Sequence, residues 1–489
     1  MTHILSPLHK LGLIVMAFSL ALLLPFVVSI LLDDGAAEHF LLSGALGFVL
    51  GAALTLFCFP FRATLRKREG ILLVFLAWIS LAIIGSLPIY LTEQLIEEDF
   101  SFAKALFEGM SGLTTTGASV INEVESLPMT INLWRHSLLW FGGMGILLLA
   151  VAIFPLFNVG GRELMHSEMP GPLKDERLTP RIASTAKMLY SIYFIASLLC
   201  VIAYKIAGLT WFDAWCHAAS TMALGGFSSF NQSFQSIDSV VVEAVAVVFM
   251  LFAGINFATH FKVLKYRDLR HYIYCPEALP FLRLVIGSGL IISAYLYFSD
   301  AYGTWTEALR YGVFNTVSVA TTTGFASTDY LTWPFVVPVF MLVLGSFASS
   351  GGSTGGGIKL IRILLVFRQM RVEMLRLLHP RGVFLVRFRK MAVSNSVLLS
   401  VMMFIAMYFM TIMVVFVLLA FGGAEEVDAL SAAVALVGNI GPALGSIGPM
   451  SNYADFNDFQ LWVGSAAMLV GRLELLTVFV IFTPHFWRR

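Results

Sequence analysis

The sequence predicts an all-α polytopic membrane protein in which ten transmembrane helices form four span–loop–span repeats around one axis, preceded by two extra N-terminal helices. Three observations predict this fold: the composition, the spacing of long apolar runs, and a short motif that recurs four times. Of the 489 residues, 58% are hydrophobic and only 12% are charged, whereas a soluble domain carries about 25% charged residues. This composition excludes an ordinary soluble enzyme and a disordered regulator, and the long apolar runs exclude the alternating strands of an outer-membrane barrel.

Charge and cysteine content exclude further classes. The net charge is +1, so bulk charge predicts no nucleic-acid partner. The four cysteines form no CxxC pair, and scattered single cysteines are typical of small buried side chains, not of disulfide scaffolds or zinc sites. The ten histidines form no HExxH pair. The sequence therefore predicts a protein that is not an enzyme.

Ten runs of about 20 apolar residues predict the membrane spans. The first run is too long for the core of a signal peptide, and no cleavage site follows it, so we expect it to be the first membrane helix. The predicted units are two N-terminal helices at 1–70 and four repeats at 71–160, 184–265, 280–370 and 391–489. The ten runs lie at 11–32, 39–61, 71–92, 134–157, 184–208, 239–261, 281–299, 333–367, 392–422 and 459–486.

Lysine and arginine alternate in density between successive connections, which predicts the orientation of the spans. The stretches 62–68, 162–187 and 359–390 are rich in both residues. The intervening connections are nearly free of them and carry acid instead, as at 97–99 and 425–426. Because basic connections stay in the cytoplasm, we expect both termini to be cytoplasmic, which agrees with an even number of spans.

Four short, weakly apolar segments, too short to cross a bilayer, resemble one another. They end in TTTGAS, GGFS, TTTGFAS and NIGPALG, and three of them keep a serine six residues before the aligned glycine. The aligned glycines are 109, 98 and 117 residues apart, one span–loop–span unit each time, so the chain contains a fourfold repeat. The segments lie near 101–116, 211–225, 304–323 and 427–440, and the aligned glycines are Gly117, Gly226, Gly324 and Gly441.

The repeated segment has a chemical reason. A short helix that enters the membrane from outside and ends half-way presents C-terminal carbonyls with about half a negative charge. Four loops of this kind around one axis form a ring of carbonyl oxygens that can replace a cation's hydration shell. A single copy would be better explained as a helix C-cap with a left-handed glycine, but four copies in matched topology favour a pore. Asp213, Glu307 and Asp428, near the outer starts of three segments, cap these helices or concentrate cations at the mouth.

These motifs, with the closing segment Gly471-Arg-Leu-Glu-Leu475, resemble the Trk/Ktr/HKT superfamily of potassium transporters over nearly the whole chain. The resemblance implies K⁺ as the transported ion, no organic cofactor in this chain, and a bacterial inner (cytoplasmic) membrane. It also implies a homodimer and a cytosolic, TrkA-like nucleotide-binding regulatory subunit. Carried over from the family, the K⁺ filter consists of Thr115, Thr116, Gly117, Leu224, Gly225, Gly226, Thr322, Thr323, Gly324, Asn439, Ile440 and Gly441.

Two features of this filter bear on selectivity. Leu224 and Asn439 stand where the other two loops have threonine, a difference that matters little if only backbone oxygens bind the ion. Each loop has one essential glycine and lacks the TVGYG sequence of tetrameric potassium channels. We therefore expect a shorter filter with fewer full oxygen cages and weaker selection against Na⁺.

The apolar run at 333–367 must be broken. As one helix it would be about 52 Å long, against about 30 Å of hydrocarbon. Residues 345–357 include six glycines, each of which costs about 1 kcal/mol in a helix, so we expect a loop beneath the filter that acts as a gate. Close helix packing through small residues is the alternative, and a phosphate loop is excluded because the GxxxxGK[ST] pattern fails. The gate candidates are Gly345, Ser349, Gly351, Gly352, Thr354, Gly355, Gly356 and Gly357, with Arg472.

Arg472 lies deep within the last span. Inserting a charged side chain at that depth of the membrane costs about 2.5–3.5 kcal/mol, and such side chains face a cavity or a partner of opposite charge. Glu474 is only two residues away and on another side of the helix, so it is a poor partner. We expect Arg472 to line the pore as a positive barrier; a structural ion pair with another span is the alternative.

Two other function classes stay open. A secondary transporter that couples K⁺ to H⁺ or Na⁺ would also contain broken helices, but it would need inverted halves, and here four copies run in one direction. A membrane scaffold would need no ring of carbonyls. The basic stretch 359–390 is predicted to be a cytosolic docking surface, although contact with lipid head groups explains its charge equally well.

Overall fold

The computed structural model describes residues 2–62, 65–96, 100–152, 178–388 and 391–488. These residues form helices almost throughout, apart from a short hairpin of β1 (Arg387–Phe388) and β2 (Met391–Ala392). The predicted all-α membrane fold is confirmed. The acidic positions 97–99 and the basic positions Arg162, Lys174 and Arg177 lie outside the described residues.

Six helical segments in the described part of the chain are long and apolar enough to cross a membrane, and two bent helix pairs raise this number to eight. The predicted span at 134–157 corresponds to a helix that begins earlier, at Met129. The predicted span at 333–367 corresponds to two separate helices, Val336–Gly345 and Leu360–Leu378. The six unbroken segments are Leu5–Leu32, Ala37–Phe57, Arg68–Thr92, Ser184–Ile206, Ala278–Phe298 and Asn395–Phe421.

The chain begins with two helical spans and continues as four similar units. The first span consists of α1 (Thr2–Ala21) and α2 (Leu23–Leu32), and the second is α3 (Ala37–Phe57). The first unit contains α4 (Lys67–Ile96), α5 (Phe102–Leu113) and α6 (Met129–Ala152), and the second α8 (Leu178–Ile206), α9 (Trp211–Ala223), α11 (Val240–Ala253) and α12 (Phe257–Tyr266). The third contains α14 (Ala278–Phe298), α15 (Trp305–Ala320), α16 (Val336–Gly345) and α17 (Leu360–Leu378), and the fourth α18 (Asn395–Phe421), α19 (Glu426–Gly438), α20 (Asp458–Arg472) and α21 (Leu475–Ile481). Short connecting helices are η1 (Phe59–Phe61), η2 (Val124–Ser126), α10 (Phe234–Ile237), α13 (Arg270–Tyr274), η4 (Tyr330–Thr332), η5 (Gly445–Ile447) and α22 (Pro484–Trp487).

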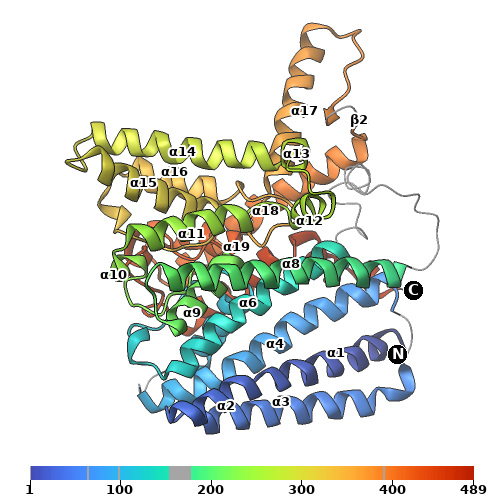
Figure 1. Cartoon of the computed structure of the whole chain (residues 1–489). Helices are drawn as coiled ribbons and strands as arrows, with labels where there is room; N and C mark the ends of the chain where they lie inside the picture. The colour runs from blue at the N-terminus through green and yellow to red at the C-terminus, as the bar shows by residue number, and fades with distance from the viewer. Residues whose placement is uncertain (1, 63–64, 97–99, 153–177, 389–390, 489) are drawn as a thin grey trace.

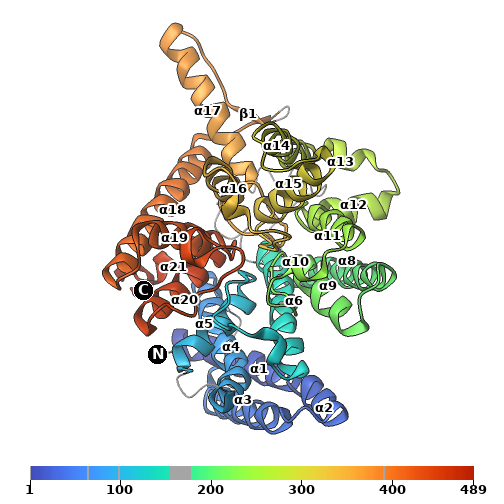
Figure 2. The same ribbon diagram turned by 90° about the vertical axis from the view of Figure 1, so that its left-hand side faces the viewer.

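The four units close into a ring. Within each unit the first long helix packs on the short helix: α4 on α5, α8 on α9, α14 on α15 and α18 on α19. The helix that follows then packs on the short helix of the next unit: α6 on α9, α11 on α15, α16 on α19, and α20 back on α5. Figure 2 shows these units arranged around a common centre, with α1–α3 outside the ring.

Three helices break where only one break was predicted. The spans 239–261 and 459–486 were expected to be continuous, but α11 and α12 meet at 91° and α20 and α21 at 112°. At the first bend Asn256 caps α12 through its side chain, which accepts the Ala258 N–H at 2.8 Å. At the second, Glu474 adopts a left-handed conformation with φ of 58°. These bends arise from single residues, so apolar run length alone did not reveal them.

Both chain ends lie at the same end of the helix bundle as α12 and α13 (Figure 1). The basic turn before α4 lies there too, because Arg68 Nη1 donates to the carbonyl of Arg488 at 2.7 Å. At the opposite end, Asp34 joins the N-terminal helices to the first unit, since its Oδ2 accepts the backbone N–H and the hydroxyl of Thr130 at 2.9 and 2.6 Å.

Candidate ion pathway

All four short helices end in the same backbone motif. The residue two positions before each aligned glycine is left-handed, with φ between 51° and 63°, and the next N–H donates to the carbonyl five residues earlier at 2.8–3.0 Å. This is the Schellman helix end. Each segment therefore ends in a helix cap, but the left-handed residue that caps the helix lies two positions before the aligned glycine. The left-handed residues are Thr115, Leu224, Thr322 and Asn439, and the N–H bonds run from Thr116 to Ser111, Gly225 to Ser220, Thr323 to Ser318 and Ile440 to Ala435.

Each aligned glycine contacts the segment of the next unit, and the four contacts form a closed ring. Each glycine is left-handed, with φ between 77° and 97°, a conformation that favours glycine. Each also lies so close to the carbonyl of the next unit that no side chain would fit between them. A Cβ would lie 1.9 Å from Gly225 O at Gly117, 2.1 Å from Thr323 O at Gly226, 2.6 Å from Ile440 O at Gly324, and 2.6 Å from Thr116 O at Gly441.

At the position before the glycine, the threonine hydroxyls are engaged in hydrogen bonds within the protein, so a ligand could be bound there by the backbone carbonyl oxygens. The hydroxyl of Thr116 lies 2.8 Å from that of Thr114, and the hydroxyl of Thr323 lies 2.7 Å from that of Thr321. Both therefore bond back to their own helix ends. The Asn439 side chain donates sideways to Thr116 Oγ1 at 2.9 Å. The departures from threonine at Leu224 and Asn439 thus leave the backbone path of the loops unchanged.

The four glycines line one hollow of about 310 Å³, together with residues of the segments that follow them, such as Ser119, Ser228 and Pro442. Asp213 and Asp428, expected either to cap helices or to attract cations, are engaged in local bonds. Asp213 Oδ1 accepts the Ser229 hydroxyl at 2.7 Å, and Asp428 Oδ1 accepts the Ser446 N–H at 3.0 Å. Glu307 lies in the exposed first turn of α15. Asp213 and Asp428 thus bind the segment that follows the glycine of their own unit, whereas the side chain that caps α9 is that of Thr210.

Residues 346–359 form an extended loop beneath the ring, between α16 and α17. The loop bonds to the helix ends above it: Gly356 N–H donates to Thr322 Oγ1 at 2.9 Å, and the Thr354 hydroxyl donates to Met222 O at 3.0 Å. A Cβ on Gly356 would lie 2.2 Å from Gly438 O. Gly345 instead ends α16 and packs on Val319, as close helix packing predicted. The loop thus touches units two, three and four directly below the filter candidates.

The other gate candidates lie along the same loop. Ser349 Oγ lies 3.5 Å from Thr321 O, at the helix end above. Gly351 and Gly352 lie at the side of the second unit, where Phe257 N–H donates to Gly352 O at 3.2 Å. A Cβ on Gly355 would lie 3.1 Å from Thr321 O, and one on Gly357 2.4 Å from Ser346 O. The loop therefore has no room for a side chain at Gly355 or Gly357, whereas a Cβ on Gly351 would meet its nearest atom, Glu277 Oε2, at 3.4 Å.

Residues 351–355 also have a G-x-S-x-G pattern, which in some hydrolases holds a nucleophile. The Ser353 hydroxyl donates to Ser350 O at 2.8 Å, and among the described residues no histidine is bonded to it. The pattern here is part of the loop between α16 and α17.

Arg472 lies at the end of α20, only 4% exposed, and Nη2 donates to Thr354 O at 2.8 Å. Within the described part of the chain no carboxylate lies within ion-pair distance of its guanidinium. Glu474 is paired instead with Arg362, with Nη2 and Oε2 2.7 Å apart. Arg472 and Lys359 line a narrow cavity below the loop of about 20 Å³, room for about one water.

Glu277 is a residue that the sequence reasoning missed. Its Oε1 accepts the backbone N–H groups of Gly351 and Ile361 at 2.9 and 3.1 Å. One carboxylate oxygen, from the connection before α14, thereby holds the middle of the loop and the first turn of α17. The residues it binds are 74 and 84 positions away, so no local pattern could have revealed it.

A family model described as a cation transport protein, TrkH, matches residues 37–286 and 303–489. This chain belongs to the TrkH family. The predicted resemblance to the Trk/Ktr/HKT superfamily is thereby confirmed, down to the bacterial TrkH type.

Relatives of the TrkH family match the chain along its full length. Trk system potassium uptake protein TrkH of Halomonas elongata is 41% identical over 482 residues, 99% of both chains. TrkH of Escherichia coli K12 is 37% identical over 477 residues, 98% of both chains. The crystal structure of the potassium transporter TrkH from Vibrio parahaemolyticus superposes with a TM-score of 0.91 at 36% identity, covering 99% of each chain. These relatives are transport proteins, and their names designate no enzyme.

Proposed function

We propose that this chain carries out potassium uptake across a bacterial inner membrane, as the names of its TrkH relatives state for them. The observation that carries the proposal is the closed ring in which each aligned glycine abuts the carbonyl of the next unit. Such a ring places oxygens from four loops around one axis, and irregular backbone inside a membrane is tolerated where it lines a water-filled path.

In this proposal K⁺ is bound by backbone oxygens at the ends of four helices. The carbonyls before the aligned glycines replace water around the ion, and the C-terminal ends of α5, α9, α15 and α19 add partial negative charge. The Schellman bonds fix the direction of each loop without using the carbonyls before the glycines. The proposed filter residues remain the twelve expected from the family, 115–117, 224–226, 322–324 and 439–441.

We expect the filter to select less strongly against Na⁺ than a TVGYG channel does. Each unit contributes only one left-handed glycine to the ring, so an ion meets fewer full oxygen cages. The measurement is the reversal potential in bilayers when K⁺ is exchanged for Na⁺ on one side. A shift as large as that of a TVGYG channel would contradict the expectation.

Gating is assigned in this proposal to the loop 346–359 with Arg472. The loop lies against the helix ends below the filter, and Arg472 holds it by a charge-assisted hydrogen bond to Thr354. Opening then requires the loop to leave Thr322 and Met222 and the guanidinium to leave the path. A cytosolic TrkA-like nucleotide-binding subunit is proposed to drive this change.

Replacing Arg472 with Ala should raise the resting K⁺ flux about tenfold, because a hydrogen bond to a charged group contributes about 1.5–3 kcal/mol. The measurement is ⁸⁶Rb⁺ flux into proteoliposomes without the regulatory subunit. R472K is the control, since it keeps the charge but not the planar fork and should give an intermediate flux. A folding defect with no change in flux per folded protein would favour a structural role instead.

Replacing Glu277 with Ala should raise resting flux about three- to tenfold. The change frees the middle of the loop and the first turn of α17, and each backbone hydrogen bond lost contributes about 0.5–1.5 kcal/mol. E277Q keeps one oxygen acceptor and should lie closer to the wild type. Equal flux in the wild type, E277Q and E277A would show that these two attachments do not control opening.

For assembly we propose a homodimer with both termini cytoplasmic. Two observations support a protein contact on the basic side. The α17 helix stands out from the ring (Figures 1 and 2), and it exposes Phe367, Leu377 and Leu378 at 63, 82 and 72%. Light scattering of the solubilised protein measures the dimer, and cysteine labelling from each side of the membrane measures the orientation.

The experiment that tests the function is ⁸⁶Rb⁺ flux in proteoliposomes that contain the purified chain together with the regulatory subunit. Fast flux down the gradient, independent of pH and Na⁺ gradients, is expected. Flux that requires a H⁺ or Na⁺ gradient would establish the coupled transporter instead, and no flux with the regulatory subunit present would overturn the proposal.

A further inference from the structure

A buried polar residue binds the chain just after the filter in three of the four units. It lies nine positions before the aligned glycine, and it is Glu108 in the first unit, His217 in the second and Asn315 in the third. All three are fully buried. Fully buried polar side chains of this kind need hydrogen-bond partners, and they find them in the chain just after their own glycine.

The three side chains bond to equivalent places. Glu108 Oε2 accepts the Val120 N–H at 2.9 Å, and the carboxylate accepts the Ser119 hydroxyl at 3.1 and 3.2 Å. His217 Nε2 lies 3.0 Å from Ser228 Oγ. Asn315 Nδ2 donates to Ser327 Oγ at 3.0 Å, and its Oδ1 accepts the Ser327 N–H at 3.2 Å. These contacts join each short helix to the segment two or three residues past its glycine, so we call the three side chains struts.

In the fourth unit other side chains hold the segment after the glycine. The equivalent residue is Ala432, and the neighbouring Ser431 exchanges hydrogen bonds with the backbone of Leu444 at 3.1 and 3.3 Å. Tyr453 donates its hydroxyl to Gly441 O at 2.8 Å. The place behind the filter therefore tolerates charged, neutral and apolar residues, provided that the loop is held.

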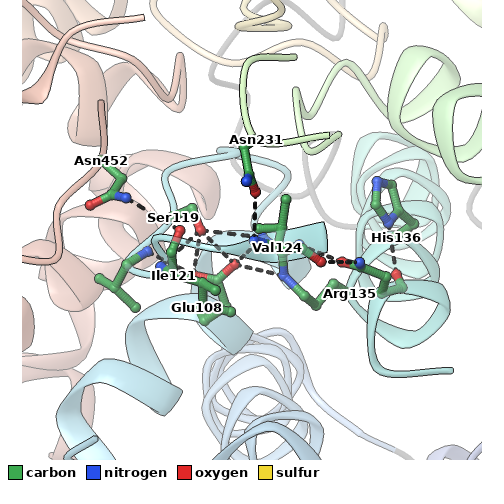
Figure 3. Close-up of polar contacts among 10 residues, drawn as sticks. Glu108, Ser119, Ile121, Val124, Arg135, His136, Asn231 and Asn452 are labelled. Atoms are coloured by element: carbon green, nitrogen blue, oxygen red, sulfur yellow. Dashed lines mark hydrogen bonds and ion pairs between the residues drawn. The ribbon is translucent and has the colours of Figure 1, made fainter. Parts of the chain in front are cut away.

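Only the first strut carries a charge. Glu108 and Arg135 are 0 and 1% exposed, and Oε1 lies 2.5 Å from Nη2 and 2.9 Å from Nε. Figure 3 shows this pair together with Ser119, whose hydroxyl also accepts from Arg135 Nη2 at 3.2 Å. The Arg135 guanidinium lies over the ring of Phe227, 4.5 Å from its centre. Phe227 directly follows the filter glycine of the second unit, so the pair touches two filter segments.

Neighbouring units hold the same loop at its outer end. Asn231, from the second unit, accepts the Val124 N–H at 2.8 Å, and Asn452, from the fourth, donates to Ile121 O at 3.2 Å. Glu108 binds the N–H of Val120, nearer the glycine. The strut is thus an inner attachment of the first loop, beside the Tyr453 N–H of the fourth unit, which donates to Ser119 O at 2.8 Å.

We propose that Glu108, oriented by Arg135, is a positioning residue that sets K⁺ over Na⁺ discrimination through the first filter segment; this rests on the proposed function above. The carboxylate holds the Val120 N–H and the Ser119 hydroxyl, and through Arg135, which lies over Phe227, it fixes the distance between units one and two. A looser segment fits the smaller Na⁺ as well as K⁺, so losing the strut changes selectivity more than it changes assembly.

The test is E108Q in the full-length protein, with the ratio of Na⁺ to K⁺ permeability measured from reversal potentials. Whichever way the new amide is turned, its NH₂ faces either the Val120 N–H or the Arg135 guanidinium. We expect the permeability ratio to rise about tenfold, the size of effect that an unpaired buried donor produces. S119A removes the shared hydroxyl without touching a charge and should shift the ratio in the same direction by less.

The matched control is E243Q. Glu243 is 4% exposed and forms an ion pair with Arg310, with Oε1 and Nη2 2.8 Å apart, but it touches no filter segment, so its ratio should equal that of the wild type. Unchanged ratios in both E108Q and S119A, or in folded S119A if E108Q does not fold, would overturn the proposal. G324A is measured in parallel. If G324A shifts the permeability ratio while the strut variants do not, only the role proposed for Glu108 is overturned. If G324A leaves the ratio unchanged, the proposed filter itself is overturned.

Discussion

Replacing Gly117 with Ala should lower K⁺ uptake about 100-fold, the scale of loss that a misplacement of about 1 Å produces in a preorganised site. The new Cβ would lie 1.9 Å from the carbonyl oxygen of Gly225, so the two segments must separate. G226A should behave alike, with a contact of 2.1 Å, and G324A and G441A should be milder, with contacts of 2.6 Å. Uptake by potassium-transport-deficient cells that express the complete transport system measures this.

A matched control separates the clash from backbone strain. Gly35 has a φ of 79°, close to the 78° of Gly117, but a Cβ there would meet no atom within 4 Å. G35A therefore carries only the strain of a left-handed alanine, about 1–2 kcal/mol, and should transport like the wild type. Equal losses in G35A and G117A, or no loss in folded G117A, would mean that the glycines do not line an ion path.

Deleting Gly355 and Gly356 should raise the resting K⁺ flux more than tenfold in the absence of the regulatory subunit. The deletion removes the Gly356 bond to Thr322 and shortens the stretch that reaches across units two, three and four. Each lost hydrogen bond contributes about 1 kcal/mol, and the packing of the loop against Gly438 is lost as well. The measurement is ⁸⁶Rb⁺ efflux from proteoliposomes, normalised to folded protein.

A point variant gives the same result with less disturbance. A Cβ on Gly356 would lie 2.2 Å from Gly438 O, so G356A should push the loop away from the filter and raise flux in the same direction. G303A is the control, because a Cβ there meets nothing within 4 Å. Wild-type flux in a well-folded deletion and in G356A together would remove the loop from the gating mechanism.

The features that could be predicted from sequence all depend on local signals. Apolar run length predicts the spans because lipid thickness sets a minimum helix length. The repeat was found because the same turn is needed at Gly117, Gly226, Gly324 and Gly441, where only glycine fits the angle and the space. The loop at 346–359 was found because six glycines within 345–357 make a continuous helix unfavourable.

What the sequence did not reveal are pairings between distant residues. Glu277 binds the loop from 74 positions away, Arg362 and Glu474 are 112 apart, and Glu108 and Arg135 are 27 apart. Any of these charges could have several partners in the sequence, and Glu474, a poor partner for Arg472 on the same helix, pairs with Arg362 of another unit. The bends before Asn256 and at Glu474 were missed for a similar reason, since one polar residue in an apolar run is a weak signal.

The amino-acid order alone therefore settles the membrane class, the four units and the glycines that must turn, because each follows from hydrophobicity or from backbone angles within a few residues. The folded chain decides that the four turns meet around one axis, that the glycine-rich loop lies directly beneath them, and that Glu108, Glu277 and Arg472 hold these parts in place. Those facts depend on which helices pack side by side. Because each short helix packs on a helix of the preceding unit, these contacts exist only when all four units are folded together.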